Sequence, residues 1–194
     1  PVLRRRQRQM CIRDSPSAAL NIMTINFLVF IYLSILISVN LMKYIIFNWK
    51  SYLNIAESMN LSKILSKLPT TKKYKLICSP NNFYNLSLKS RYPKNIYAAQ
   101  NIDLHGKGAS TGSIDIEDLV NNKIKYCILG HSEVRSNFGE TDLIVQKKTD
   151  LCLINKIKPI VCIGEPLKIY KSKKTKFFLK KQINNIFKKS NNYE

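Results

Sequence analysis

Five short apolar runs, each followed by a helical pattern, constrain the fold of this chain more than any other feature. Short runs that are rich in Ile, Val, Leu and Tyr and bounded by Gly, Pro or polar residues are typical of buried strands. The predicted strands are Lys43–Phe47, Tyr74–Cys78, Ile96–Asn101, Tyr126–Leu129 and Pro159–Gly164. Strands that alternate with helices form a parallel sheet with helical crossovers, so the sequence predicts an α/β fold.

Apolar residues near a 3.6-residue spacing fill the segments that follow these runs. The predicted helices cover Leu53–Leu68, Phe83–Leu88, Asp115–Leu119, Thr141–Asn155 and the lysine-rich tail Lys168–Glu194. Pro69 closes the first helix, and Asp115 is placed as the N-cap of the third. Lys147 and Lys148 interrupt the apolar face of the fourth, and a polar, glycine-bearing loop, Asp103–Ser113, precedes the third.

Two parallel architectures fit this alternation: an open, doubly wound sheet and part of an eight-stranded barrel. Doubly wound domains that bind a dinucleotide carry Gly-x-Gly-x-x-Gly after the first strand. This chain has Asn48-Trp49-Lys50 at that place. The absence of the glycine motif favours the barrel.

The fourth predicted strand ends at Gly130 and is followed directly by His131, Ser132 and Glu133. In α/β proteins, catalytic groups are placed at the carboxyl edge of the parallel sheet, where such a loop begins. Taken alone, His131 is more simply interpreted as a capped loop histidine with ordinary backbone bonds. The neighbouring residue types make proton chemistry the alternative interpretation.

Composition limits the classes of function. The 194 residues are 45% apolar, enough for one domain with a buried core. The net charge of +20 would suit nucleic acid or an anionic membrane, but lysine is spread along the chain and no nucleic-acid motif accompanies it, so we expect no nucleic-acid partner. Five cysteines without a C-x-x-C pair argue against a disulfide framework or a metal site and favour a reducing, cytoplasmic location.

Residues 1–41 differ from the rest of the chain. Arg-rich residues precede Leu20–Leu41, a run without charge that is long enough to span a bilayer, so a signal anchor is one interpretation. Several Asn, Ser and Thr residues dilute that run, and the Arg-rich segment resembles translated adapter or vector sequence. We therefore expect a leader of upstream read-through at 1–41 and a native start at Met42, with one domain over 42–194.

The residues at the ends of the predicted strands resemble those of the triosephosphate isomerase family. The matching motifs, in chain order, are Asn48-Trp49-Lys50, Ala99-Gln100-Asn101, Ile128-Leu129-Gly130-His131-Ser132-Glu133, Phe138-Gly139-Glu140 and Cys162-Ile163-Gly164-Glu165. Each motif is weak alone, but all five occur in the family's order and cover residues 42 to about 167. The resemblance implies a (β/α)8 barrel, here reduced to about five βα units.

The resemblance also implies an activity: interconversion of dihydroxyacetone phosphate and glyceraldehyde 3-phosphate in glycolysis and gluconeogenesis. The family works as a homodimer without cofactor or metal. Carried over by position, Asn48 and Lys50 would bind substrate, and Lys50 and His131 would be catalytic.

The other positions carried over from the family have supporting roles. Ser132 and Glu133 would support the catalytic groups, and Thr111 and Gly112 would belong to the dimer loop. Glu140 and Glu165 are interpreted as structural rather than chemical.

The chain also departs from the family's pattern. From Met42 it has 153 residues, whereas a full barrel needs about 250. The family's base-bearing lid, an Ala-Tyr-Glu-Pro-type segment, and its glycine-rich phosphate loops have no counterpart, so we expect the chain as given to be inactive. Val134 replaces the first of two usual arginines and leaves Arg135. The alternative function is a membrane-anchored, basic, non-catalytic half-barrel that serves as an interaction module.

Overall fold

The structure, a computed structural model, describes residues 42–69, 71, 73–106 and 108–187. The predicted leader or anchor at 1–41 lies outside these residues, and so does the end of the predicted basic tail. Among the described residues, no helix combines the length and the apolar character that crossing a membrane requires.

The five predicted strands and all but one of the helices following them are confirmed, with small shifts of their ends. The strands are β1 (Lys43–Asn48), β2 (Tyr74–Ser79), β3 (Ile96–Ala99), β4 (Tyr126–Leu129) and β5 (Lys158–Val161). The helices are α2 (Ile55–Leu65), η1 (Asn82–Tyr84), α3 (Asn85–Arg91), α4 (Ile116–Asn121), α5 (Ser132–Phe138), α6 (Asp142–Ile154), α7 (Leu167–Lys171) and α8 (Thr175–Phe187).

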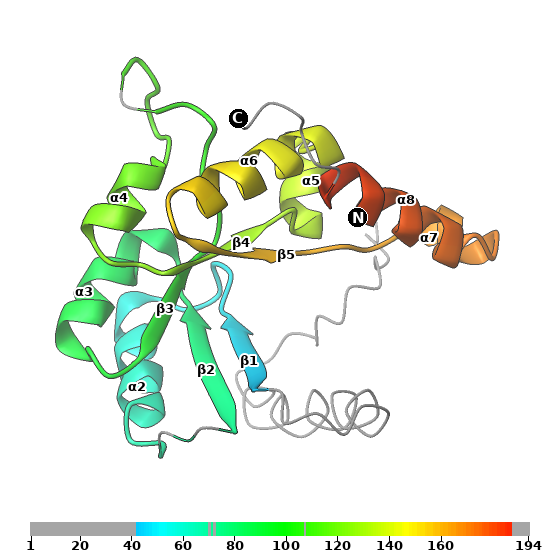
Figure 1. Ribbon diagram of the computed structural model, residues 1–194. Coiled ribbons are helices and arrows are strands. Elements are labelled where there is room, and N and C mark those ends of the chain that lie inside the picture. Colours follow the sequence, from blue (N-terminus) through cyan, green and yellow to red (C-terminus); the bar gives the residue numbers. More distant parts are fainter. Residues whose placement is uncertain (1–41, 70, 72, 107, 188–194) are drawn as a thin grey trace, which may run out of the picture.

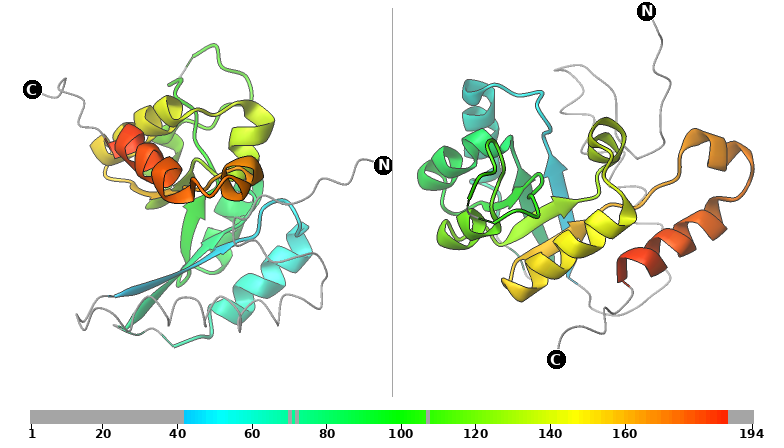
Figure 2. Two further views of the ribbon diagram at one scale, coloured as in Figure 1. Left: turned by 90° about the vertical axis from the view of Figure 1, so that its right-hand side faces the viewer. Right: turned by 90° about the horizontal axis from the view of Figure 1, so that it is seen from above.

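The strands form one parallel sheet in the order β1-β2-β3-β4-β5. A doubly wound sheet reverses its strand order at a switch point, whereas a barrel keeps the order of the chain. The sheet curls, with the crossover helices α2, α3, α4 and α6 on its outer side (Figures 1 and 2). The prediction of part of a (β/α)8 barrel is therefore confirmed for these five units.

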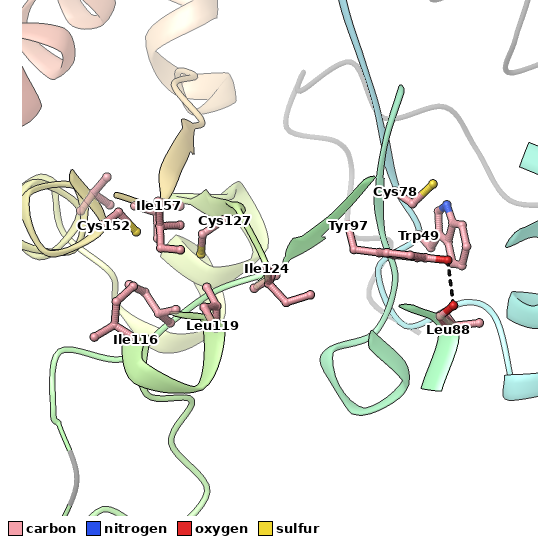
Figure 3. Close-up of a cluster of buried hydrophobic side chains, with 14 of the residues drawn as sticks. Trp49, Cys78, Leu88, Tyr97, Ile116, Leu119, Ile124, Cys127, Cys152 and Ile157 are labelled. Carbon is pink, nitrogen blue, oxygen red and sulfur yellow. Dashed lines mark hydrogen bonds between the residues drawn. The ribbon is translucent and has the colours of Figure 1, made fainter. Parts of the chain in front are cut away.

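Alternate strand side chains point to opposite faces of the sheet. Those on the outer face pack against the helices and form the main core. Tyr97 and Cys127 of the strands pack there with helix residues such as Leu88 and Leu119 (Figure 3). The Tyr97 hydroxyl donates to the Leu88 carbonyl oxygen at 3.1 Å, so this buried phenol is satisfied.

A smaller cluster lies on the concave face and consists of strand residues alone. Ile77, Ala98 and Tyr126 form it, with partly buried residues of β3 and β5 packed against them. At the β1 edge of this face Tyr44 and Ile46 are each 39% exposed. The inner layer is therefore better covered over β2 to β4 than over β1.

The sequence predicts a loop after Gly130, but the structure has helix α5 there, which is a correction. His131 caps its N-terminus, and Gly139, at φ 68°, ends it in the left-handed region. None of its residues is buried, so the segment has no apolar stripe from which periodicity could have predicted a helix.

The single tail helix predicted from Lys168 is also corrected. Two helices, α7 and α8, occupy its described part, and Lys173 lies between them at φ 59°. A left-handed residue ends a helix. Lysine is an uncommon residue in that conformation, so its presence did not predict the end of a helix at this position.

Candidate active site

The residues that follow β1 are held in an unusual backbone conformation. Lys50 has φ 51°, which costs a residue with a Cβ roughly 1–2 kcal/mol. Its amide donates to Asn48 Oδ1 at 3.0 Å, and its carbonyl oxygen accepts from Gln100 Nε2 at 2.8 Å. Strained backbone that the surroundings hold so firmly is concentrated at functional sites.

Gln100 ties the carboxyl ends of three strands together. Besides the Lys50 carbonyl, its Nε2 donates to the Ser79 carbonyl at 3.1 Å and lies 3.5 Å from Asn48 Oδ1. Its own amide donates to Asn82 Oδ1 at 2.8 Å. Gln100 was not among the predicted site residues. Its place directly after the third strand, at the same sheet edge as Lys50, is the signal that could have indicated a role.

Lys50 reaches from the end of β1 to helix α5. Its Nζ lies 2.7 Å from Glu133 Oε1, a contact between positions 83 apart in the chain. The Lys50 side chain is 19% exposed and that of Glu133 is 48% exposed. The ammonium group is thus held by Glu133 beyond the carboxyl end of β1, where both side chains remain partly exposed to solvent.

His131 is the N-cap of α5 and is 8% exposed. Its Nδ1 accepts the Glu133 amide hydrogen at 3.4 Å, so the ring proton belongs on Nε2. Burial lowers the pKa of His131 below its usual value, the charge on Lys50 lowers it further, and Glu133 opposes both. Both observations favour a neutral imidazole with its proton on Nε2 near pH 7.

The predicted site residues do not all meet. Asn48, Lys50, His131 and Glu133 come together at the carboxyl ends of β1 and β4, with Ser132 as the first residue of α5. Thr111 and Gly112 lie instead on the long connection from β3 to α4, which projects beyond the helices in Figure 1, and both are exposed.

A hollow of about 350 Å³ lies beside this site rather than on it. Its lining includes Gly130, Ser132 and Arg135 on one side and Glu165 and Gln182 on the other. Glu165, interpreted as structural, accepts a bond from the Thr175 hydroxyl at 3.2 Å, where α8 begins. No group of three metal-ligating side chains occurs within the part of the chain that the structure describes.

The arrangement suits the stabilisation of an oxyanion. An ammonium group and a neutral N–H donor at one sheet edge can both bind an oxygen on which negative charge develops, and donors fixed before the reaction need no reorganisation.

Comparison with known proteins identifies the family. A family model described as triosephosphate isomerase matches residues 43–194. Proteins named triosephosphate isomerase from Mycoplasmoides gallisepticum and Mycoplasma mobile are 34% and 35% identical over 144 and 153 residues, which are 73% and 75% of this chain. The one from Mycoplasmoides pirum is 41% identical over 137 residues, covering 68% of this chain and 89% of that protein.

The matched region is shorter than the first two of these relatives. The chain spans 57% of the M. gallisepticum protein and 63% of the M. mobile protein. The family match nevertheless covers every strand of the sheet and each of Asn48, Lys50, His131 and Glu133. The chain therefore belongs to the triosephosphate isomerase family.

Proposed function

We propose that this protein interconverts dihydroxyacetone phosphate and glyceraldehyde 3-phosphate through an enediolate. A base removes a proton from the carbon next to the substrate carbonyl, and negative charge develops on the carbonyl oxygen. The hydroxyl proton moves to that oxygen, and the base returns its proton to the former carbonyl carbon. The chain described here supplies the electrophilic groups for this reaction, Lys50 and His131, with Asn48 as a further binding residue.

The observation that carries the proposal is the joint placement of Lys50 and His131. Each is held by backbone or side-chain bonds at the same sheet edge, and Glu133 lies 2.7 Å from Lys50 Nζ and 3.5 Å from His131 Nδ1. Fixed donors of this kind contribute about 10²–10³ each in rate, and a positioned base adds about 10²–10⁴. Glu133 therefore orients both groups, with its carboxylate on Lys50 Nζ and its backbone amide on His131 Nδ1.

The neutral state of His131 supports the same reaction. An imidazole can polarise a carbonyl and move a proton between two oxygens, and triosephosphate isomerases are a known instance of a neutral histidine in this role. In this chain the acceptor role of Nδ1 and the burial of the ring favour that state. The ammonium group of Lys50 would also attract the negatively charged phosphate of the substrate.

The subunit arrangement and location belong to the same proposal. Family membership supports a homodimer, and the exposure of Thr111 and Gly112 leaves their loop available for a subunit contact. No disulfide joins cysteines among the described residues, and Cys78, Cys127 and Cys152 are buried, which supports a reducing, cytoplasmic location. Sedimentation of the protein expressed from its natural gene tests the dimer.

Isomerase activity of the protein expressed from its natural gene tests the reaction. We expect activity in the parent, and a loss of about 10²-fold or more in kcat for His131→Gln and for Lys50→Met. The matched controls are His105→Gln, which changes the chain's other histidine, and Lys67→Met; both residues are exposed, and neither change should affect kcat.

The 194-residue chain should itself show no measurable isomerase activity, because no segment of it resembles the family's base-bearing lid. Turnover by this chain would contradict that expectation. The proposed function itself would be contradicted if the protein expressed from its natural gene were inactive, or if its His131→Gln variant were fully active.

A further inference from the structure

The single glycine between β4 and α5 is held at both of its peptide groups. The Gly130 amide donates to Glu140 Oε2 at 3.0 Å, and its carbonyl oxygen accepts from Arg135 Nε at 2.7 Å. Gly130 has φ 69°, in the region that glycine enters at no steric cost. A residue with so much freedom would otherwise be the loosest point of the chain next to His131.

Both groups that hold Gly130 are members of ion pairs. Glu140 Oε1 accepts from Lys148 Nζ at 2.7 Å, and these side chains are only 3% and 6% exposed. Arg135 Nη1 lies 2.8 Å from Asp142 Oδ1. Lys148 also donates to Asn101 Oδ1 at 3.2 Å, which connects the pair to the end of β3.

A buried ion pair is a costly way to fill space. Apolar residues of similar size are often as stabilising or more so, because two charges must be removed from water. Glu140 and Lys148 are nevertheless buried, with each Glu140 oxygen bound to one donor. Within the described part of the chain, the backbone group hydrogen-bonded to this pair is the Gly130 amide, which an apolar pair could not bind.

The orientation of α5 needs such a restraint. The strand ends at Leu129, the helix begins at Ser132, and only Gly130 and His131 connect them. None of the α5 residues is buried, so packing contributes little to the direction of this helix. Its direction, and with it the place of the His131 ring, relies instead on polar contacts: the bonds at Gly130, the pair of Arg135 with Asp142, and the pair of Glu133 with Lys50.

We propose that Glu140 and Arg135 are positioning residues for His131, and that Lys148 is buried in order to hold Glu140 against the Gly130 amide. The inference rests on the proposed function, in which His131 Nε2–H faces the substrate. Fixing both Gly130 peptides fixes the start of α5, which keeps the Glu133 amide on His131 Nδ1 and so keeps the proton on Nε2.

Two double variants separate this role from simple packing. In Glu140→Leu with Lys148→Met, an apolar pair fills the space and the Gly130 amide loses its acceptor. In Glu140→Gln with Lys148→Met, the charges are also gone, but the glutamine side-chain oxygen can still accept from that amide. Arg135→Met tests the other side of Gly130 at a half-buried position, which keeps the inference testable if the first variant does not fold.

The measurements are the ¹⁵N shifts of the His131 ring and the hydrogen exchange of the Glu133 amide, made on the 194-residue chain. His105, exposed and the only other histidine, is the internal reference. We expect the leucine variant and Arg135→Met to lose the single Nε2–H tautomer and to exchange the Glu133 amide about tenfold faster or more. The glutamine variant should restore both readouts toward the parent.

Unchanged ring shifts in the leucine variant and in Arg135→Met would overturn the inference, and so would equal effects of the leucine and glutamine variants. In the protein expressed from its natural gene, the Glu140→Leu, Lys148→Met double variant should lower kcat about ten- to hundredfold with little change in KM. A parent without isomerase activity would refute the proposed function and leave the ring measurement valid. An active parent with an unaffected leucine variant would refute the positioning role alone.

Discussion

Adding one methyl group at Gly130 should destabilise the protein more than the same change at Gly139. Both glycines are left-handed, at φ 69° and φ 68°, so alanine costs roughly 1–2 kcal/mol of backbone strain at either position. At Gly130 the new Cβ would also lie 2.8 Å from Arg135 Nη2 and 3.1 Å from the Cys162 carbonyl oxygen. Overpacking of this kind costs about 1–3 kcal/mol more.

Gly139 is the matched control, because a Cβ there meets nothing within 4 Å. The strain and the effect of alanine on the unfolded chain are common to both variants, so their difference isolates the close contacts at Gly130. With a urea m-value of about 2 kcal/mol/M, the two midpoints should differ by about 0.5–1.5 M. Equal midpoints for Gly130→Ala and Gly139→Ala would refute the claim that Gly130 is tightly enclosed.

Three further predictions concern single contacts, each measured by urea unfolding. Burial lowers the pKa of His131, so the unfolded state binds the ring proton more tightly and the free energy of unfolding falls as the pH drops below about 6.5. His131→Gln should make the free energy of unfolding less dependent on pH in this range, and an unchanged pH dependence would contradict the prediction. Asn54→Ala removes the capping box with Glu57 at the start of α2 and should cost about 1 kcal/mol; no loss would mean that the cap contributes nothing. Lys148→Met alone leaves Glu140 buried without its partner and should cost about 3–5 kcal/mol, more than Glu140→Leu with Lys148→Met; the reverse order would contradict the ion-pair argument.

The sequence predicted the sheet well because its strands are buried. Continuous apolar runs such as Tyr126–Leu129 have few alternatives once Gly and Pro bound them, and the βα alternation then sets the topology. The carboxyl edge followed from that topology, so Lys50 and His131 could be assigned to one edge before any contact was known. The glycine motif's absence then separated a barrel from a doubly wound sheet, which the strand order confirms.

The local contacts were less predictable, for specific reasons. Helix α5 has no buried face, so it leaves no periodic signal. Lys148 reads as an interruption of an apolar face, because a pattern cannot show that Glu140 lies opposite it in space. Gln100 and Arg135 act through backbone carbonyls, and bonds to backbone groups leave no trace in the partner's residue type.

The carboxylates near the site suggest how the chemistry is divided. Glu133 is paired with Lys50, Glu140 with Lys148 and the Gly130 amide, Asp142 with Arg135, and Glu165 accepts from Thr175. A general base must be able to approach a carbon-bound proton, and a carboxylate that already holds a structural partner would have to give up that partner first. In the proposed reaction, these acidic side chains would therefore position donors, while Lys50 and His131 would face the developing charge. We therefore expect the rate of the proposed isomerisation to depend on how firmly the contacts of Gly130 and Gln100 hold Lys50 and His131 in place.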